Sequence, residues 1–336
     1  MLPQIHLLIF SLLIFPGLIF TLSLGLFTEW YIRKFVARLQ SRMGPSYVGP
    51  FGILQPLADL IKLLSVKEEI KQRLSSLRLA KAFAFLGIGA AVVSLLLLPI
   101  SPYRLIAPYD FLIYIYLCCI WIPFSLIMMS LSMPNPFTSI GISRLLSIFV
   151  VSEPIHFTAM IIPVMLSTHL YGSYCEAPYS MICASRYGVW LWTNPALVVP
   201  MALALIAVLV TLQARAMFQP FNIPEAEQEI IAGFATEFSG PILAFNNLLH
   251  DIDIAITLVF IVYVFLGGPY PFPHLSVQGV LILIVKYLAL LTLISIIKAS
   301  FGRFRIEQGI KSLLKYGGVP VGIALILTTV LLYIKP

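Results

Sequence analysis

Residues 195–212 read PALVVPMALALIAVLVTL, an apolar run without a single charged side chain. A helix of about 20 apolar residues covers the hydrocarbon core of a bilayer, which is about 30 Å thick. The run therefore predicts a transmembrane helix. Shortly after it comes FNIPEAEQE, residues 221–229, with three carboxylates in five residues. Charges at the mouth of a membrane span are costly and usually functional.

Similar apolar runs recur along the whole chain. Of its 336 residues, 60% are hydrophobic and 10% charged, whereas a soluble domain has roughly 25% charged residues. We expect an all-α, polytopic membrane protein forming one domain, 1–336, without internal repeats. The predicted spans are eight: 5–28, 82–100, 110–132, 145–167, 194–214, 240–266, 277–300 and 315–334.

The lysines and arginines predict the orientation. Of 21 such residues, the segments 29–81, 133–144, 215–239 and 298–315 hold ten, one (Arg144), one (Arg215) and five. Cytoplasmic loops are rich in Lys and Arg, so these segments are expected inside the cell and both termini outside a multi-pass cell-membrane protein. The net charge of +7 reflects this bias, and no nucleic-acid partner is implied.

The first cytoplasmic loop, 42–64, begins with RMGPSYVGPFG, whose glycines and prolines predict a fixed, non-helical turn. After Pro56 the pattern becomes helical but is too short to span, so a short amphipathic helix is expected at the membrane interface. Asp59 and Lys62 are spaced as an i,i+3 pair on one helix face. The segment is either a surface anchor with a solvated pair or a functional site.

The acidic loop continues to Glu237. A helix beginning at Pro224, a favoured first position, would align three carboxylates on one face, with Glu227 off it. These three are Glu225, Glu229 and Glu237. The first acids could simply compensate the helix dipole, a contribution of a few tenths to about 1 kcal/mol each. The deeper ones suit proton exchange or a cationic partner.

Several ionisable residues lie inside predicted spans, where each costs about 2.5–3.5 kcal/mol at mid-membrane. Glu153 and His156 share a helix face, and Pro154 frees a carbonyl group beside them; together they could hold a proton or a water molecule. The alternative is a buried pair or a position near the interface. The same two readings hold for the cluster of His250, Asp251 and Asp253, whose depth stays open.

The four cysteines do not form a metal motif. Cys118 and Cys119 are adjacent in a span and cannot face one metal, so we interpret them as packing residues. Cys175 and Cys183 share a predicted outer loop, where a disulfide can form. We expect them to pair, although spacing alone does not show that the two sulfurs meet.

Three segments together carry a family resemblance. They are GPSYVGPFGILQPLADLIK (44–62), PFNIPEAEQEIIAGFATEFSG (220–240) and RFRIEQ (303–308). In this order they resemble the membrane subunit of respiratory complex I that is called subunit 1 in mitochondria, and its bacterial equivalent. Counterparts occur in membrane-bound energy-converting [NiFe] hydrogenases and related ferredoxin-linked complexes. The resemblance covers nearly the whole chain, about 33 to 308.

The resemblance implies a subunit that anchors an electron-transfer arm to a membrane arm and begins a chain of charged residues across the membrane. The charge-relay candidates are then Asp59, Lys62, Glu153, Glu225, Glu227, Glu229 and Glu237. The candidates for holding the partner are Arg33, Lys34, Arg42, Arg303 and Arg305. No cofactor or metal is expected on this chain; iron–sulfur clusters, with or without a NiFe centre, are expected on partner subunits.

Some positions depart from the complex I pattern. Ile32-Arg33-Lys34 stands where complex I has Glu-Arg-Lys, and Pro220-Phe221-Asn222 replaces Pro-Phe-Asp. These departures favour a hydrogenase-type or other ferredoxin-oxidising complex over a quinone-reducing one. Expected partners are hydrogenase-like or complex I-like cytoplasmic subunits including a 4Fe–4S subunit, antiporter-like and small membrane subunits, and the lipid bilayer. The terminal electron acceptor and the pumped ion stay open.

Two other classes of function fit the sequence less well. A stand-alone secondary transporter would often show inverted repeats and broken helices at mid-membrane, but no matching halves occur here and most charges lie in loops. A passive structural anchor predicts that variants of the carboxylates assemble and pump ions normally. A quinone-chamber subunit of an NADH– or ferredoxin–quinone oxidoreductase is the alternative within the family.

Overall fold

The computed structural model describes residues 2–66, 73–103, 107–273 and 276–334. Lys67, Lys71, Arg104 and Lys335, four of the basic residues of the sequence, lie outside this part. No strand occurs among the described residues, and eight helical stretches are long and apolar enough to cross a membrane, as predicted. They are Ile5–Leu39, Leu77–Leu97, Asp110–Leu131, Pro136–Tyr174, Pro195–Arg215, Gly240–Leu266, Val277–Ser300 and Ile306–Tyr333.

The α-helices of the described part are α1 (Leu2–Leu13), α2 (Leu18–Leu39), α3 (Gln55–Leu64), α4 (Leu77–Ser94), α5 (Asp110–Tyr114), α6 (Ile122–Leu131), α7 (Pro136–Tyr171), α8 (Met181–Leu191), α9 (Pro195–Arg215), α10 (Glu227–Ile230), α11 (Gly240–Leu266), α12 (Val277–Ser300), α13 (Ile306–Leu313) and α14 (Val319–Ile334). Two π-helical segments, Ile115–Trp121 and Leu314–Gly318, interrupt the third and the last span. The predicted short helix after the first loop is α3.

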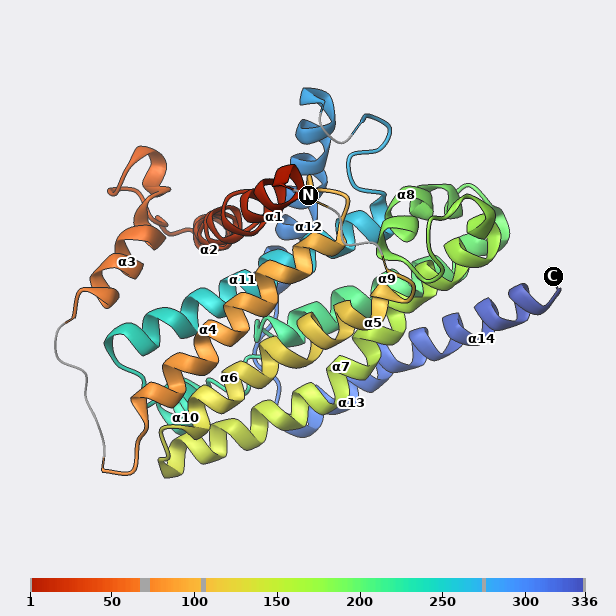
Figure 1. The fold of residues 1–336 in the computed structure, drawn as a ribbon. Coiled ribbons are helices and arrows are strands. Elements are labelled where there is room, and N and C mark those ends of the chain that lie inside the picture. The colour runs from red at the N-terminus through yellow and green to blue at the C-terminus, as the bar shows by residue number, and fades with distance from the viewer. Residues whose placement is uncertain (1, 67–72, 104–106, 274–275, 335–336) are drawn as a thin grey trace.

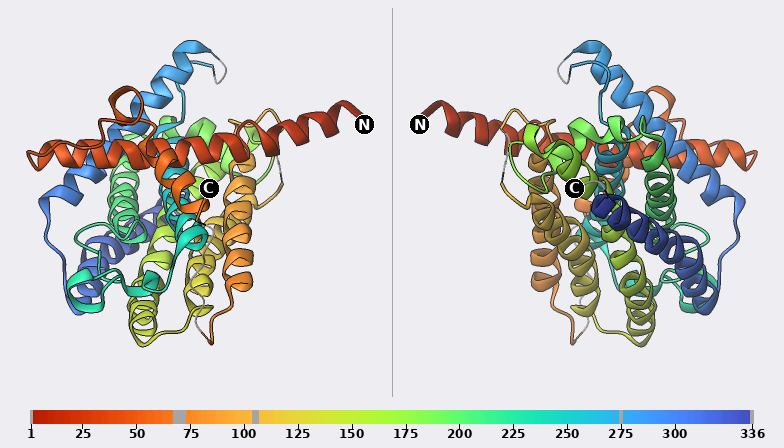
Figure 2. Two further views of the ribbon diagram at one scale, coloured as in Figure 1. Left: turned by 90° about the vertical axis from the view of Figure 1, so that its left-hand side faces the viewer. Right: turned by 90° about the vertical axis from the view of Figure 1, so that its right-hand side faces the viewer.

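The first predicted span is divided into two helices. α1 ends at Leu13 and α2 begins at Leu18, with Pro16 and Gly17 between them. Proline cannot donate the backbone hydrogen bond that would continue the helix, which explains the break. The two helices form a long arm that lies across the other helices, with the N-terminus projecting from the bundle (Figure 2).

Five helices form a closed ring in which each packs against the next: α4, α6, α7, α9 and α11. They run side by side in Figure 1. α11 is the most enclosed of the spans, because 94% of the residues in its apolar 18-residue stretch are buried. Gly87 lets α4 approach α11 closely, since a Cβ atom there would come 2.8 Å from Leu249.

The loops predicted to be cytoplasmic gather at one end of the bundle. α3, α10 and the turn between α6 and α7 lie at the left of Figure 1, whereas α8 and the C-terminus lie at the right. The long helices between them separate the two groups of loops. The charged loops of the sequence therefore meet in space at one end, where a site can form from several of them.

Candidate functional site

Arg33, near the end of α2, connects this helix to α3. Its guanidinium lies 2.7 Å from the carboxylate of Glu29 and 2.8 Å from that of Asp59. Gln55 also donates a hydrogen bond to Asp59, at 2.9 Å. The predicted pairing of Asp59 with Lys62 is wrong, because Asp59 faces the guanidinium of α2 while Lys62 is exposed. Arg33, expected to hold a partner, holds a helix of its own chain.

Lys34 fixes the loop that precedes α3. Its ammonium group donates to the carbonyl oxygens of Pro45 and Phe51, at 2.6 and 3.3 Å. The side chains of Met43, Tyr47 and Phe51 nevertheless point outward and are 80, 97 and 77% exposed. Large apolar side chains gathered on the surface mark interaction sites. We refer to these three residues as the apolar loop face.

Two of the predicted docking arginines are exposed at the same end of the bundle. Arg42 donates from Nε to the side chain of Gln40 at 2.9 Å. Arg305 immediately precedes α13, and its backbone N–H donates to the side chain of Gln308 at 3.1 Å. Both side chains are exposed, so their guanidinium groups are accessible to another molecule.

The acidic loop is not the long helix predicted from Pro224. Only Glu227–Ile230 is α-helical, followed by a 3-10 turn at Gly233–Ala235, and the backbone reverses at Ile231 and Gly233, where φ is 60° and 56°. Such left-handed conformations end a right-handed helix. The chain closes tightly here, because a Cβ atom on Gly233 would come 1.8 Å from the carbonyl oxygen of Pro224. Glu225, Glu229 and Glu237 therefore do not share the one helix face that was expected.

Glu229 binds two arginines from distant segments. Its carboxylate lies 2.6 Å from Arg144 of α7 and 2.8 Å from Arg303, which precedes α13. Arg303 also donates to the side chain of Gln228, at 3.0 Å. The hydrogen bond from Arg144, together with the positive charges of Arg144, Arg303 and Arg305, lowers the pKa of Glu229 below its ordinary value of 4.5. These ion pairs fix the acidic loop against α7 and the segment before α13.

Glu237 is fixed to the start of α7. Its carboxylate accepts a hydrogen bond from the amide of Asn135. The carbonyl oxygen of the same amide accepts from the backbone N–H of Phe137 at 3.0 Å and so caps α7. One side chain thus connects the acidic loop with a helix of the ring.

A cavity of about 520 Å³ lies between α2, the acidic loop, α11 and α12. Its charged lining consists of the carboxylates of Glu29, Glu225, Glu227 and Asp251 and the cations of Arg33 and Lys298. The ammonium of Lys298 also lies over the ring of Phe218, 3.5 Å from its centre. Ligand pockets for small organic molecules are mostly apolar, whereas this lining suits water and ions.

The cluster at 250–253 divides between two environments. His250 and Asp251 line the cavity, with 4.0 Å between the imidazole Nδ1 and the carboxylate. Nε2 of His250 lies 3.0 Å from the carbonyl oxygen of Ala216. Asp253 points instead into the ring of helices. His250 and Asp251 are thus at the cavity wall, whereas Asp253 lies in the interior of the bundle.

The ring encloses a buried triad of Glu153, Arg215 and Asp253, from α7, α9 and α11. Nη1 of Arg215 donates to Glu153 at 2.7 Å and Nη2 donates to Asp253 at 2.8 Å. The three side chains are 14, 1 and 7% exposed in the order Glu153, Arg215, Asp253. Two carboxylates share one guanidinium, so with both ionised the triad carries one negative charge.

Arg215 is a residue whose place the sequence did not indicate. The distribution of basic residues predicts that it belongs to a cytoplasmic loop, but it is the last residue of α9 and is buried in the triad. An arginine that directly follows an apolar run looks like an interfacial residue. Asp253, a carboxylate inside a predicted span, was the available signal that a buried cation had to lie nearby.

A second polar chain lies in the interior of the ring. The imidazole of His156 lies between the hydroxyl groups of Tyr114 and Thr211, with Nε2 3.2 Å from Tyr114 and Nδ1 3.0 Å from Thr211. Thr211 donates its own proton to the carbonyl oxygen of Ala207. Its oxygen can therefore accept from Nδ1–H, which leaves Nε2 to accept from Tyr114. His156 thus has hydrogen-bonded neighbours on both ring nitrogens.

The other end of the bundle carries structural polar contacts. Cys175 and Cys183 form a disulfide there, with their Cα atoms 5.5 Å apart, whereas Cys118 and Cys119, inside the third span, are free and buried. Lys286 donates to three carbonyl oxygens at the end of α11 and just beyond it, those of Leu266, Gly268 and Tyr270.

Among the described residues no group of three His, Cys, Asp or Glu side chains is arranged to hold a metal ion.

Fold and site together define a multi-pass, all-helical membrane protein with charged groups enclosed in its helix bundle. Residues 12–330 match the family described as NADH dehydrogenase, and the chain belongs to this family. It is also similar to a chain in the structure of the membrane-bound sulfane sulfur reductase (MBS), an archaeal respiratory membrane complex. The TM-score is 0.78 at 26% identity, over 96% of this chain and 99% of that chain. The resemblance inferred from the three sequence segments is confirmed.

Proposed function

We propose that this chain is a membrane subunit of a multi-subunit respiratory redox complex, of the hydrogenase type or another ferredoxin-oxidising kind. It anchors a cytoplasmic electron-transfer module and couples the redox reaction to proton or sodium translocation. The observation that carries the proposal is the buried triad beside a charged cavity. Buried charge is costly and is characteristic of ion pathways in membrane proteins. The family match and the similarity to the sulfane sulfur reductase chain support the same role.

The docking role rests on the apolar loop face. Lys34 holds the backbone of this loop, so Met43, Tyr47 and Phe51 are presented without a large ordering cost on binding. Exposed Arg42, Lys62 and Arg305 at the same end would pair with acids of the partner. The partner is a cytoplasmic subunit carrying a 4Fe–4S cluster. The bias of Lys and Arg supports a cytoplasmic location for this end, with both termini outside.

The coupling role rests on the proximity of cavity and triad. Ala216, in the cavity wall, directly follows Arg215, and Asp251 in the same wall lies two residues before Asp253. A charge that enters past Glu225 or Glu227 would thus meet the titratable groups of the cavity wall, within one helix turn of Asp253 along α11. Glu229 and Glu237, which are engaged by Arg144, Arg303 and Asn135, hold the loop in place. Antiporter-like and small membrane subunits would continue the path across the membrane.

The substitution Glu153→Gln tests the coupling role. It keeps the shape of the side chain and removes its charge, so the complex should assemble and its cytoplasmic module should still reduce a soluble dye. Ion translocation into vesicles should fall. Glu307→Gln is the matched control, because Glu307 is exposed on α13. Normal translocation by the Glu153→Gln variant would leave only the docking role.

A second candidate is a quinone-chamber subunit of an NADH– or ferredoxin–quinone oxidoreductase. The cavity beside Arg33, with its volume of about 520 Å³, is the observation that favours it. Its four carboxylates and two cations oppose it, because an apolar quinone would displace their water without replacing the hydrogen bonds. Quinone reduction by the purified complex, inhibited by a quinone analogue, would establish this alternative. Co-purification in mild detergent with iron–sulfur subunits is expected for both candidates.

A further inference from the structure

The third span contains an unusual backbone segment next to the triad. Ile115–Trp121, between α5 and α6, is a π-helix. In this form the carbonyl group of residue i accepts from the N–H of residue i+5, whereas an α-helix uses i+4. Single π-helical turns are rare and occur frequently at functional sites. The segment therefore calls for a local physical explanation.

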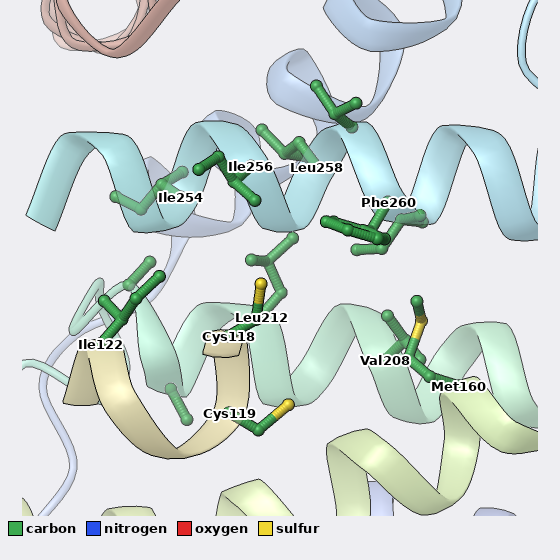
Figure 3. Packing of buried hydrophobic residues seen from close by; sticks show 14 of the residues in the cluster. Cys118, Cys119, Ile122, Met160, Val208, Leu212, Ile254, Ile256, Leu258 and Phe260 are labelled. Atoms are coloured by element: carbon green, nitrogen blue, oxygen red, sulfur yellow. The ribbon is translucent and has the colours of Figure 1, made fainter. Parts of the chain in front are cut away.

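Because of Pro123, the register of this segment decides which carbonyl group lacks a backbone donor. Pro123 lies five residues after Cys118 and four after Cys119, and proline has no N–H to donate. In the π register the carbonyl of Cys118 therefore has no backbone donor. In the α register the carbonyl of Cys119 would be the one without a donor. Consecutive helix residues point about 100° apart. Figure 3 shows the Cys118 side chain towards α11 and beside Leu212, with Cys119 pointing elsewhere.

The carbonyl oxygen of Cys118 has a different donor, Arg215. Nη2 of Arg215 lies 2.9 Å from this oxygen, and the same nitrogen donates to Asp253. Nη1 donates to Glu153. The guanidinium is planar, and its donors have fixed directions. The three acceptors, Glu153, Asp253 and the Cys118 carbonyl, therefore determine where the guanidinium of Arg215 lies between the two carboxylates.

We propose that Pro123 and the π register of Ile115–Trp121 position Arg215 between Glu153 and Asp253. A change of the segment to the α register would turn the unpaired carbonyl away from Arg215 and alter how the guanidinium divides between the two acids. Pro123 is a positioning residue, since it acts through the Cys118 carbonyl. The inference rests on the proposed coupling function of Glu153 and adds the element that controls its counter-charge.

Pro123→Ala tests this proposal in the whole complex, reconstituted in vesicles. Alanine restores the N–H, so the Cys118 carbonyl can be satisfied within the helix and no longer requires Arg215. One hydrogen bond to a charged group shifts an equilibrium by about tenfold or more, so the guanidinium should redistribute between the two acids and the number of ions moved per electron should fall. Dye reduction by the cytoplasmic module should be unchanged. A structure of the variant should lack the Arg215–Cys118 contact.

Pro163→Ala is the matched control, because it also removes a proline from a helix interior, further along α7. It should leave the ions moved per electron unchanged. A merely structural Pro123 would lower the yield of assembled complex without changing this ratio, and that result would overturn the proposal. If Pro123→Ala does not assemble, Pro123→Val, which restores the same backbone N–H with a side chain close in size to proline, is the second variant. Full coupling in that variant also overturns the proposal.

Comparison with Glu153→Gln separates the two levels of inference. Normal coupling in Pro123→Ala with impaired coupling in Glu153→Gln contradicts only the positioning role. Normal coupling in both variants contradicts the coupling function and the positioning role together. Impaired coupling in both, with the Pro163→Ala control unaffected, supports both.

Discussion

Arg215 donates a hydrogen bond of 2.8 Å to Asp253 across the contact between α9 and α11. The two side chains are only 1 and 7% exposed. A buried ion pair has a large desolvation cost, and removing one partner leaves the other charge uncompensated. The two residues therefore depend on each other, and Glu153 on the opposite side of the guanidinium depends on the same cation.

Replacement of Arg215 by methionine should strongly destabilise the protein. It leaves Glu153 and Asp253 buried without a cation, and breaking a buried pair typically costs about 3–5 kcal/mol. Thermal unfolding of the detergent-solubilised protein measures the effect. Arg38→Met, at an exposed position of α2, is the control and should change little. Combining Arg215→Met with Glu153→Leu and Asp253→Leu should recover part of the loss; no recovery would argue against unpaired charge as the cause.

Tyr47→Ala should weaken binding of the cytoplasmic module without affecting the fold. The side chain is 97% exposed, so its loss removes no internal packing, while truncation of an aromatic anchor in an interface typically costs about 2 kcal/mol. Salt-dependent release of the module from membranes measures the loss. Tyr333→Ala, 90% exposed at the other end of the chain, is the matched control. Equal release from both variants would contradict a docking role of the apolar loop face.

The contacts of Glu229 should stabilise the acidic loop in a pH-dependent way. The pKa of Glu229 is lowered by Arg144 and Arg303, so its contribution is present in full above the ordinary value of 4.5. It is lost as the pH falls through the lower pKa of the folded state. Proteolysis of the loop should distinguish wild type from Glu229→Gln above this window but not at the acid end. A difference that persists unchanged in acid would show that the carboxylate charge is not the cause.

The outer disulfide should protect two of the four thiols. Without reductant, Cys175 and Cys183 should not react with a maleimide in the unfolded protein, whereas Cys118 and Cys119 should react once unfolding exposes them. Cys183→Ser should destabilise the outer loop locally and leave the bundle assembled, because the spans are held by their own packing. Four reactive thiols in the unreduced, unfolded protein would refute the disulfide.

The membrane spans and the short helix α3 could be predicted from the sequence. In a bilayer every backbone N–H and C=O must be satisfied within the segment, so an apolar run of sufficient length becomes a helix almost irrespective of its neighbours. Pro16 and Gly17, which divide the first run, were also visible, but the expected span ignored them. The first loop, which carries the proposed docking surface, was partly predictable as well, since its glycines and prolines specify its turn locally.

The acidic loop and the triad were decided by tertiary structure. Pro224 and the spacing of the glutamates favour a helix, but intrinsic helix preference is worth only a few tenths of a kcal/mol per residue. The loop instead forms ion pairs between Glu229 and two arginines distant in sequence, Arg144 and Arg303, which are 85 and 74 residues away. Its backbone is not the predicted long helix. The sequence by itself thus determined the class, the spans and the family of this protein. The partner of each buried or looped charge was decided only when the helices of the ring packed, because electrostatic pairing depends on distance in space and not on spacing along the chain.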